Sequence, residues 1–221
     1  MTQIDIDRPD WPERIVRLRR GIVKRSIDVI GALFGLIFFA PFLIIVALAI
    51  YVGGGGPVIY AHRRIGKGGV AFDCLKFRTM ARDGDAVLAA YLAANPEARR
   101  EWAAARKLVH DPRVSCLGHL LRRTSLDELP QLWNVLRGDM SLVGPRPIVE
   151  DERHHYGQHM LSYCSVRPGL TGAWQVSGRS DTTYPERVAM DVNYVRSRTN
   201  RRDLLIMGRT VGVLISGRGA R

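Results

Sequence analysis

Two adjacent carboxylates, Asp127 and Glu128, stand in the stretch RRTSLDELPQLWNVLRGDMSLVGPRP, residues 122–147. Ser125 lies three residues before Glu128, which is the spacing of a capping box, so a helix is expected to begin here. Acidic residues favour helix N-termini because of the helix dipole, and the capping box already accounts for Glu128. Taken alone, the motif fits an ordinary helix start better than a catalytic pair.

The helix that follows is expected to be short and amphipathic, with both carboxylates in its first turn. Its apolar stripe would be formed by Leu129, Leu132, Trp133 and Leu136. Gly138 would end the helix, because glycine readily adopts the left-handed conformation that follows many helices.

Arginines on both sides of this helix favour chemistry at a phosphate. Arg122 and Arg123 precede it, and Arg146 lies between Pro145 and Pro147, whose rings stiffen the loop. A guanidinium on a stiff loop suits bidentate phosphate binding, and a helix N-terminus is itself an anion site. A carboxylate is ionised at neutral pH and can form an acyl phosphate. Its repulsion from the phosphate would be offset by the arginines, the dipole and a divalent cation.

The chain that must position these residues is strongly basic. Its 221 residues suit one compact domain with an appendage, and its formal net charge is +12. That excess implies an anionic partner, which could be nucleic acid, acidic lipid or a phosphorylated substrate. Cys74, Cys116 and Cys164 are far apart and odd in number, so buried free thiols in a reducing compartment are expected.

Residues 29–52 read VIGALFGLIFFAPFLIIVALAIYV, an uncharged run long enough to cross a bilayer. Pro41 lies near its middle, where a proline kinks or breaks a helix. Both flanks are basic, and the positive-inside rule is satisfied at both only if the segment enters and leaves on the same side. A re-entrant helical hairpin is therefore favoured over the alternative, a kinked transmembrane helix.

The sequence thus predicts three parts and an α+β fold. Residues 1–25 would form a basic segment at the membrane surface, residues 26–54 a re-entrant membrane helix broken at Pro41, and residues 55–221 a cytoplasmic domain. The domain is expected to be small and mostly helical. A short β-hairpin is predicted for VIYAHRRIG and AFDCLKFRTM, and helices on both sides of Asn95-Pro96.

Several blocks, in their order, resemble the bacterial sugar transferases, also called monotopic phosphoglycosyl transferases or polyprenyl-phosphate glycosyl-1-phosphate transferases. They are KRSIDVIGAL, AHRRIGKGG, KFRTM, the 122–147 stretch and RPGLTGAWQVSGR at 167–179. The resemblance runs from Lys24 to the C-terminus and is to the small, exopolysaccharide-type form, which lacks the extra spans of larger members. Ala40-Pro41 departs from the Ser-Pro pair that many members have at the membrane break.

The resemblance implies a two-step, Mg²⁺-dependent reaction at the bacterial inner membrane, with the domain facing the cytoplasm. Asp127 would attack the β-phosphate of a UDP-sugar and release UMP, and undecaprenyl phosphate would then accept the phosphosugar. The product, a polyprenyl-diphosphate-sugar, would initiate synthesis of an exopolysaccharide or related glycan. Glu128, with Asp127, would bind Mg²⁺ or handle the acceptor's proton.

The resemblance also implies the walls of the site. Phosphate or nucleotide binding falls on Arg78, Arg122, Arg123, Arg146 and Arg179. The donor-site wall falls on Pro145, Pro147, Trp174 and Gln175.

Two other classes of function stay open beside the transferase. One is a non-enzymatic basic membrane adaptor that binds anionic lipid or nucleic acid, and the other is a phosphohydrolase using the same carboxylates. No recognised nucleic-acid motif is visible, so nucleic acid is not expected as a partner. The expected partners are a UDP-sugar, undecaprenyl phosphate, inner-membrane lipid and downstream glycosyltransferases.

Overall fold

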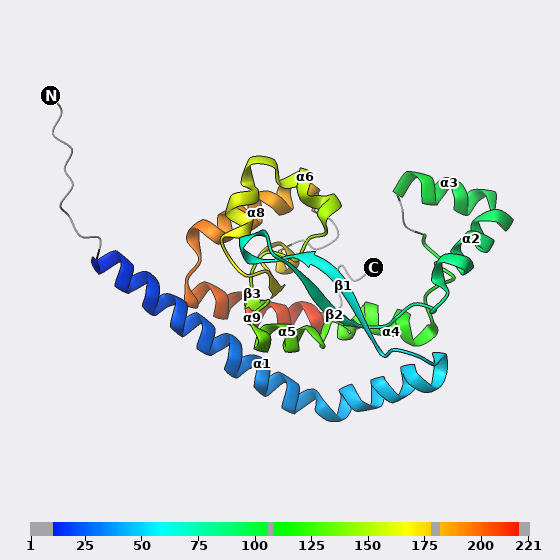
Figure 1. Ribbon diagram of the computed structural model, residues 1–221, viewed down its shortest axis with the longest axis horizontal. Coiled ribbons are helices and arrows are strands. Elements are labelled where there is room, and N and C mark those ends of the chain that lie inside the picture. The colour runs from blue at the N-terminus through cyan, green and yellow to red at the C-terminus, as the bar shows by residue number, and fades with distance from the viewer. Residues whose placement is uncertain (1–10, 106–107, 178–181, 217–221) are drawn as a thin grey trace.

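A single 44-residue helix, α1 (Trp11–Gly54), runs along one side of the molecule, and the other helices and strands lie on one side of it (Figure 1). The structure, a computed structural model, describes residues 11–105, 108–177 and 182–216. The part Gly21–Gly54 is long and apolar enough to cross a membrane, and only 11% of its most apolar window is buried. The core helix of a soluble protein would be mostly covered, so this exposure fits a helix in lipid.

The expected break at Pro41 is wrong, because α1 passes through Pro41 as one continuous helix. The helix nevertheless changes direction along its length (Figure 1). A proline inside a helix removes one backbone hydrogen bond and crowds the preceding turn, which is the usual cause of such a bend. α1 is thus one bent helix rather than two helices separated by a loop.

The predicted β-hairpin is confirmed. β1 (Ile59–Ile65) and β2 (Ala71–Phe77) pair antiparallel, and their turn holds the short helix η1 (Lys67–Gly69). Gly68 and Gly69 have φ values of 71° and 77°, which glycine adopts without steric cost. A second, parallel pair joins β3 (Ser141–Val143) to β4 (Gly169–Thr171), which gives a mostly helical fold with small sheets, as expected.

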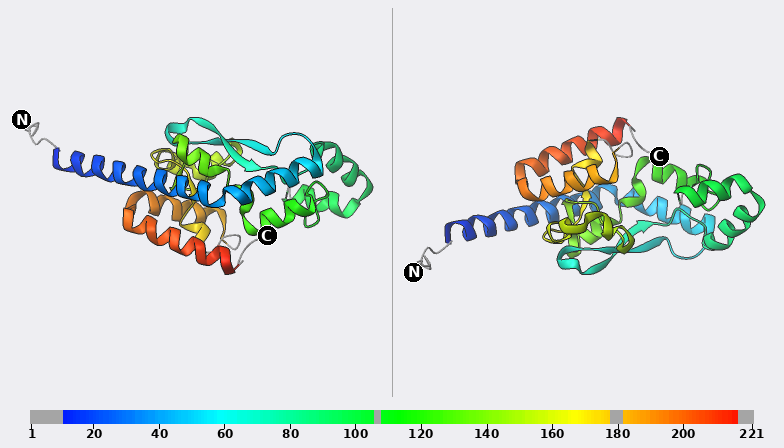
Figure 2. Two further views of the ribbon diagram at one scale, coloured as in Figure 1. Left: turned by 90° about the horizontal axis from the view of Figure 1, so that it is seen from below. Right: turned by 90° about the horizontal axis from the view of Figure 1, so that it is seen from above.

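The remaining elements are short helices. They are α2 (Gly84–Ala94), α3 (Pro96–Ala105), α4 (Cys116–Thr124), η2 (Leu126–Glu128), α5 (Gln131–Arg137), η3 (Glu150–Glu152), α6 (Arg153–Tyr156), η4 (Gly157–His159), α7 (Met160–Cys164), η5 (Trp174–Val176), α8 (Tyr184–Ser197) and α9 (Asn200–Ser216). The predicted helix break at Asn95-Pro96 is confirmed by α2 and α3, which stand at one end of the molecule (Figure 1). The hairpin and α9 lie on opposite flanks of α1 (Figure 2).

Apolar residues of α1 pack directly on the domain. Gly31 and Gly35, one turn apart, allow this approach: a Cβ on Gly31 would lie 2.6 Å from Leu142 Cδ1, and one on Gly35 would lie 3.0 Å from Leu132 Cδ1. The core beneath this contact contains Ala32, Phe72, Cys74, Leu132, Val135 and Met140. All three cysteines are free, but only Cys74 is buried; the expectation of burial is wrong for the exposed Cys116.

A buried polar cluster fixes the start of the membrane segment to the domain. Lys24 Nζ lies 2.8 Å from Asp28 Oδ1 and 3.3 Å from Asp203 Oδ2. Asp28 is 1% exposed and also accepts hydrogen bonds from Ser141 Oγ and the Leu142 backbone N–H, both at 3.0 Å. Because buried charges persist only when they are paired and hydrogen-bonded, this cluster specifies how α1 lies against β3 and α9.

Candidate active site

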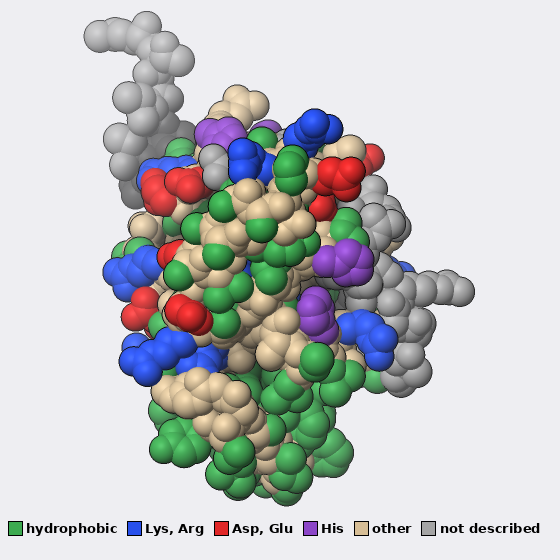
Figure 3. All heavy atoms as spheres, turned by 90° about the vertical axis from the view of Figure 1, so that its right-hand side faces the viewer, with side chains coloured by type: hydrophobic (Ala, Val, Ile, Leu, Met, Phe, Trp, Pro, Cys, Tyr) green, Lys and Arg blue, Asp and Glu red, His purple; other side chains and the backbone are tan. Residues whose placement is uncertain are grey.

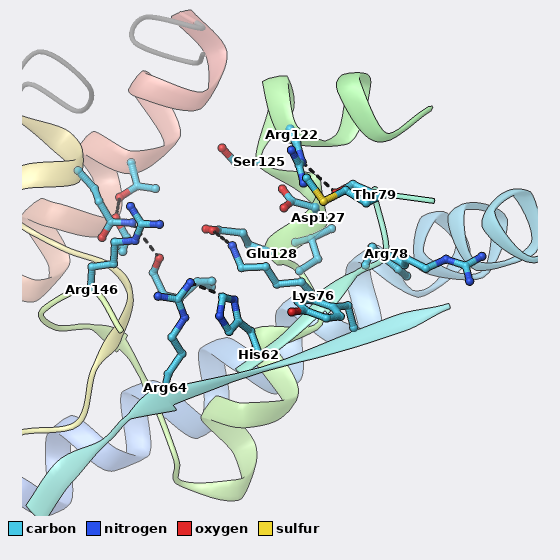
Figure 4. Close-up of a pocket in the computed structure, with 18 of the residues that line it drawn as sticks. His62, Arg64, Lys76, Arg78, Thr79, Arg122, Ser125, Asp127, Glu128 and Arg146 are labelled. Carbon is cyan, nitrogen blue, oxygen red and sulfur yellow. Dashed lines mark hydrogen bonds and ion pairs between the residues drawn. The ribbon is translucent and has the colours of Figure 1, made fainter. Parts of the chain in front are cut away.

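Asp127 and Glu128 lie in an open groove of about 1150 Å³. Its walls come from the hairpin, the segment after β2, α4 and η2, the loop after β3, η5, α8 and α9. Segments far apart in the sequence therefore meet around the two carboxylates (Figure 4).

The local structure at the carboxylates differs from the predicted helix start. Ser125 has a φ of 58° and ends α4, with its backbone N–H donating to the Arg122 carbonyl at 3.1 Å. Its side chain makes no capping hydrogen bond, so the predicted capping box is wrong. A serine that caps a helix N-terminus normally has an extended backbone. Ser125 has a left-handed backbone because it ends α4, so it cannot cap the next helix in this way. Asp127 and Glu128 instead lie in the single turn η2, before α5.

The predicted amphipathic helix corresponds to α5, and its end is as expected. Gly138 has a φ of 93° and follows the last turn. Arg25 of α1 also binds this end, because its guanidinium donates to the carbonyls of Val135 and Leu136 at 2.6 and 2.8 Å. The stripe is only partly confirmed: Leu132 is buried, Leu129 and Leu136 pack partly buried on the core, but Trp133 is 52% exposed.

Asp127 is a nearly buried carboxylate, 9% exposed. Burial raises its pKa to about 6, and Glu128 adds to this rise, while Lys76 and Arg122 oppose it. At pH 7 the group is still about ten to one in favour of the ionised form. Asp127 is thus a poorly solvated carboxylate that remains charged, as a nucleophile needs to be.

Glu128 is bound to a lysine of the hairpin. Its Oε1 lies 2.6 Å from Lys76 Nζ (Figure 4). Burial alone would raise the pKa of Glu128, but Lys76, Arg146 and Arg64 together lower it below its ordinary value. Adjacent carboxylates with pKa values pushed apart are typical of sites that give them different roles.

Cations surround the pair from several elements. Arg122 of α4 donates from Nε to Thr79 Oγ1 at 2.9 Å beside Asp127. Arg146 approaches from the loop after β3, with its Cζ 5.8 Å from the centre of the Trp174 ring. Arg64 of β1 lies on the same side, and burial and the charge of Arg146 lower its pKa. An anion placed among these groups would relieve their mutual repulsion.

The structure brings together only some of the residues expected at the site. Arg122, Arg146, Trp174 and Gln175 line the groove with the two carboxylates. Pro145 and Pro147 are buried and hold the loop of Arg146, with Pro147 lining a small recess beside Glu128. The roles expected for them, phosphate binding for the arginines and a donor wall for the others, stay predictions.

The other three arginines expected to bind phosphate differ in where they stand. Arg78 lines the groove, but its side chain extends away from the carboxylates toward the end of α1 (Figure 4). Arg123 is exposed and lies outside the set of groove-lining residues. Arg179 lies outside the described residues.

Sequence reasoning missed the contribution of the hairpin. His62, Arg64 and Lys76 line the groove, and Lys76 makes the closest contact with Glu128. Tyr60 pairs with Lys76 in the register, so residues 60, 62 and 64 of β1 share one face with Lys76. Alternation along the two predicted strands was the available signal for these side chains.

The two carboxylates supply oxygen ligands that fit Mg²⁺. Within the described ranges, no group of three or more His, Cys, Asp or Glu residues could hold a metal by itself. Mg²⁺ at phosphate-transfer sites is commonly bound through one or two carboxylates together with substrate phosphates and water. Asp127 and Glu128 are therefore suited to a Mg²⁺ ion that arrives with a phosphorylated substrate.

Comparison with known proteins gives consistent matches. The model of the family Bacterial sugar transferase matches residues 19–217. The chain is 48% identical over 205 residues to exopolysaccharide production protein ExoY of Rhizobium meliloti, covering 93% of this chain and 91% of that protein. It is 46% identical over 198 residues to undecaprenyl-phosphate galactose phosphotransferase of Salmonella typhimurium, covering 90% and 41%. It is 40% identical over 225 residues to UDP-glucose:undecaprenyl-phosphate glucose-1-phosphate transferase of Caulobacter vibrioides, covering 97% and 77%.

Proposed function

Because the chain belongs to the family of bacterial sugar transferases, we propose that it transfers a sugar 1-phosphate from a UDP-sugar to undecaprenyl phosphate. The family match confirms the resemblance seen in the sequence and favours a transferase over a non-enzymatic adaptor. The names of the Salmonella and Caulobacter relatives support the acceptor and a hexose phosphate as the transferred group. The name of the Rhizobium relative supports a role in exopolysaccharide production, and we propose that this role is the initiating step.

The observation that carries this proposal is a buried, ionised Asp127 inside a cationic groove. In the first step a carboxylate oxygen of Asp127 attacks the β-phosphorus of the UDP-sugar. The bond from that phosphorus to the bridging oxygen breaks, and UMP leaves with the electron pair. Arg122, Arg146 and Lys76 would balance the charge on the diphosphate during this step.

In the second step an oxygen of undecaprenyl phosphate attacks the phosphorus that is bound to Asp127. The acyl-phosphate bond breaks, the Asp127 carboxylate is released, and the lipid carries a diphosphate-linked sugar. The enzyme returns to its starting state without an oxidant, reductant or added base. An aspartyl phosphate of this kind is an established form of covalent catalysis.

Glu128 suits a ligand role better than a proton-accepting one. Its lowered pKa keeps it ionised and makes it a weak base. With Asp127 it would hold Mg²⁺ beside the diphosphate. When bound, that ion supplies charge neutralisation on the phosphate oxygens.

The membrane segment is proposed to be re-entrant at the inner membrane, with the domain on the cytoplasmic side. Basic residues flank the apolar part of α1 at both ends, and its bend supplies the change of direction that a return to the same side needs. The groove is lined by Pro57, just beyond the end of α1, so a lipid phosphate could reach it without leaving the membrane surface.

The test separates the two steps. Purified protein in nanodiscs, given Mg²⁺ and UDP-galactose or UDP-glucose without acceptor, should release about one UMP per enzyme and then stop. Adding undecaprenyl phosphate should start turnover. Asp127→Asn should abolish UMP release, and Arg63→Gln, a change on an exposed arginine of β1, should leave it unchanged.

Two results would contradict the proposal. Wild-type turnover in the Asp127→Asn variant would show that Asp127 is not the nucleophile. Continuous release of UMP and free sugar phosphate without acceptor would instead support the phosphohydrolase alternative.

A further inference from the structure

Arg78 lies against the glycine run that ends the membrane helix. Its Nη2 donates to the Gly55 carbonyl at 2.6 Å. A Cβ on Gly54 would lie 3.1 Å from Nη2, and one on Gly56 would lie 3.3 Å from Nη1. Side chains at these positions would crowd the guanidinium, so the glycines allow it to rest on the backbone just beyond α1.

The same guanidinium has one donor without a partner. Arg78 Nη1 is buried and has no hydrogen-bond partner among the described residues. Nor does any carboxylate in the described part of the chain form an ion pair with Arg78. An unpaired buried donor on a charged group is costly, and an anionic ligand with oxygen acceptors would satisfy it.

Arg82 adds a second positive charge at this place. Its Nη1 lies 3.5 Å from the position of a Cβ on Gly56, the glycine that also contacts Arg78. Both arginines line the groove that holds Asp127. The guanidinium groups of Arg78 and Arg82, which both lie next to Gly56, form a cationic end of the groove. This end is separate from the cations around Glu128.

This end of the groove lies where the apolar surface stops. Tyr51 and Val52, in the last turn of α1, are 61% and 83% exposed, and Tyr60 on the groove wall is 53% exposed. Apolar side chains gather at the lower end of the face in Figure 3, and charged side chains lie above them. Exposed tyrosines at such a boundary are typical of the membrane–water interface.

The opposite end of the groove has a different character. Arg146 and Arg187 both lie over the ring of Trp174, at 5.8 and 4.7 Å from its centre. Figure 4 shows Arg146 and Arg78 on opposite sides of Asp127 and Glu128. The carboxylates therefore lie between a cationic, aromatic end inside the domain and a cationic end beside the membrane helix.

We infer that Arg78, with Arg82, binds the phosphate monoester of the lipid acceptor, while the end at Arg146, Trp174 and Arg187 takes the nucleotide donor. The inference rests on the proposed function and deepens it. A soluble donor can reach either end, but a phosphate tethered to a polyprenyl chain must enter from the membrane surface. Arg78 is the groove arginine attached to that surface through Gly55.

The test measures donor and acceptor dependence separately. Arg78→Gln, in nanodiscs of phosphatidylcholine without anionic lipid, should raise the KM for undecaprenyl phosphate about tenfold or more, as expected when charged hydrogen bonds are lost. The UMP burst without acceptor and the KM for the UDP-sugar should stay at wild-type values. Arg78→Lys should recover part of the acceptor affinity because it keeps the charge.

Arg63→Gln is the matched control, since this exposed arginine lies outside the groove and pairs with Asp73. An unchanged acceptor KM in Arg78→Gln would overturn the inference. So would a raised donor KM with a smaller UMP burst, which would place Arg78 in the donor site. An equal loss of binding to phosphatidylglycerol vesicles in flotation would overturn it in favour of general lipid anchoring. Absence of a UMP burst in the wild type would be a failure of the proposed function itself.

Discussion

Asp127 and Glu128 are neighbours in the chain, yet their surroundings shift their pKa values in opposite directions. Burial dominates at Asp127, which has no close ion pair among the described residues. At Glu128 burial would raise the pKa, but the contact with Lys76 and the charges of Arg146 and Arg64 together lower it. The fold thereby produces one poorly stabilised carboxylate, suited to attack, and one firmly ionised carboxylate, suited to hold positive charge.

The raised pKa of Asp127 predicts a cost in stability. Its folded pKa of about 6 lies above the unfolded value of 3.8, so the folded state binds the proton more tightly. Its contribution is fully present below pH 3.8 and is lost as the pH rises through 6. Asp127→Asn should therefore be more stable than wild type at neutral pH, by up to about 3 kcal/mol, and similar to it near pH 4.

Thermal unfolding from pH 4 to pH 8, with EDTA present, measures this difference. Asp73→Asn, a change at a half-exposed carboxylate on the outer face of β2, should show no comparable gain. If the stability of the wild type and of Asp127→Asn changed with pH in the same way, folding would not raise the pKa of Asp127.

The sequence was informative about site residues that share one contiguous motif. Asp127, Glu128, Arg122 and Arg146 were all expected and all line the groove. Lys76 was missed because its contact with Glu128 spans 52 residues, and only the strand register brings the two together. Alternation along the strand indicates which face Lys76 shares, but not which distant carboxylate lies against that face.

At the scale of elements, the polar cluster at Lys24 joins four segments. Tyr194 of α8 places its hydroxyl 2.7 Å from Asp203 of α9 and 3.0 Å from the Val143 carbonyl of β3. Lys24 of α1 lies between Asp203 and Asp28. Because the polar groups of the cluster are hydrogen-bonded or ion-paired with one another, the cluster fixes the position of the membrane helix relative to the groove.

Removing Asp28 should be strongly destabilising. Asp28→Ala leaves the Leu142 N–H without its buried acceptor and removes one of the two carboxylates paired with Lys24, and breaking a buried pair in this way typically costs about 3–5 kcal/mol. Asp73→Ala, which removes an exposed ion pair, should change stability by less than about 0.5 kcal/mol. Denaturant unfolding in one detergent compares the variants, and a wild-type midpoint for Asp28→Ala would show that the cluster contributes little.

The sequence predicted turns and helix ends correctly where they depend on the residues at that position alone. The hairpin, the break at Asn95-Pro96 and the helix end at Gly138 all follow from turn-forming residues. The capping box failed because Ser125 was already used by α4, and the break at Pro41 failed because the helix continues past the proline. Both outcomes depend on neighbouring structure that the motif does not contain.

At the scale of the whole molecule, apolar surface and charge are segregated. Many of the exposed large apolar side chains belong to α1. Apolar side chains gather at the lower end of the face in Figure 3, with charged side chains above them. The groove is lined by Pro57, just beyond the end of α1. Under the proposed function, a lipid acceptor and a soluble donor would meet at Asp127 without either crossing the membrane. That arrangement requires both ends of α1 to lie on the side of the domain.

Cysteine labelling tests this topology. In a background of Cys116→Ser and Cys164→Ser, Gly21→Cys near one end of the apolar part and Leu161→Cys on the domain give two exposed probes. A membrane-impermeant maleimide should label neither in intact spheroplasts and both after permeabilisation. Labelling of only one of them in intact cells would mean that α1 spans the membrane.

The most direct test of the central claim is mass spectrometry of the enzyme after reaction with a UDP-sugar in the absence of acceptor. A hexose phosphate adduct is expected on the peptide containing Asp127, to be lost when undecaprenyl phosphate is added and absent from Asp127→Asn. An adduct on a different residue, or UMP release by an enzyme that carries no adduct, would contradict the account.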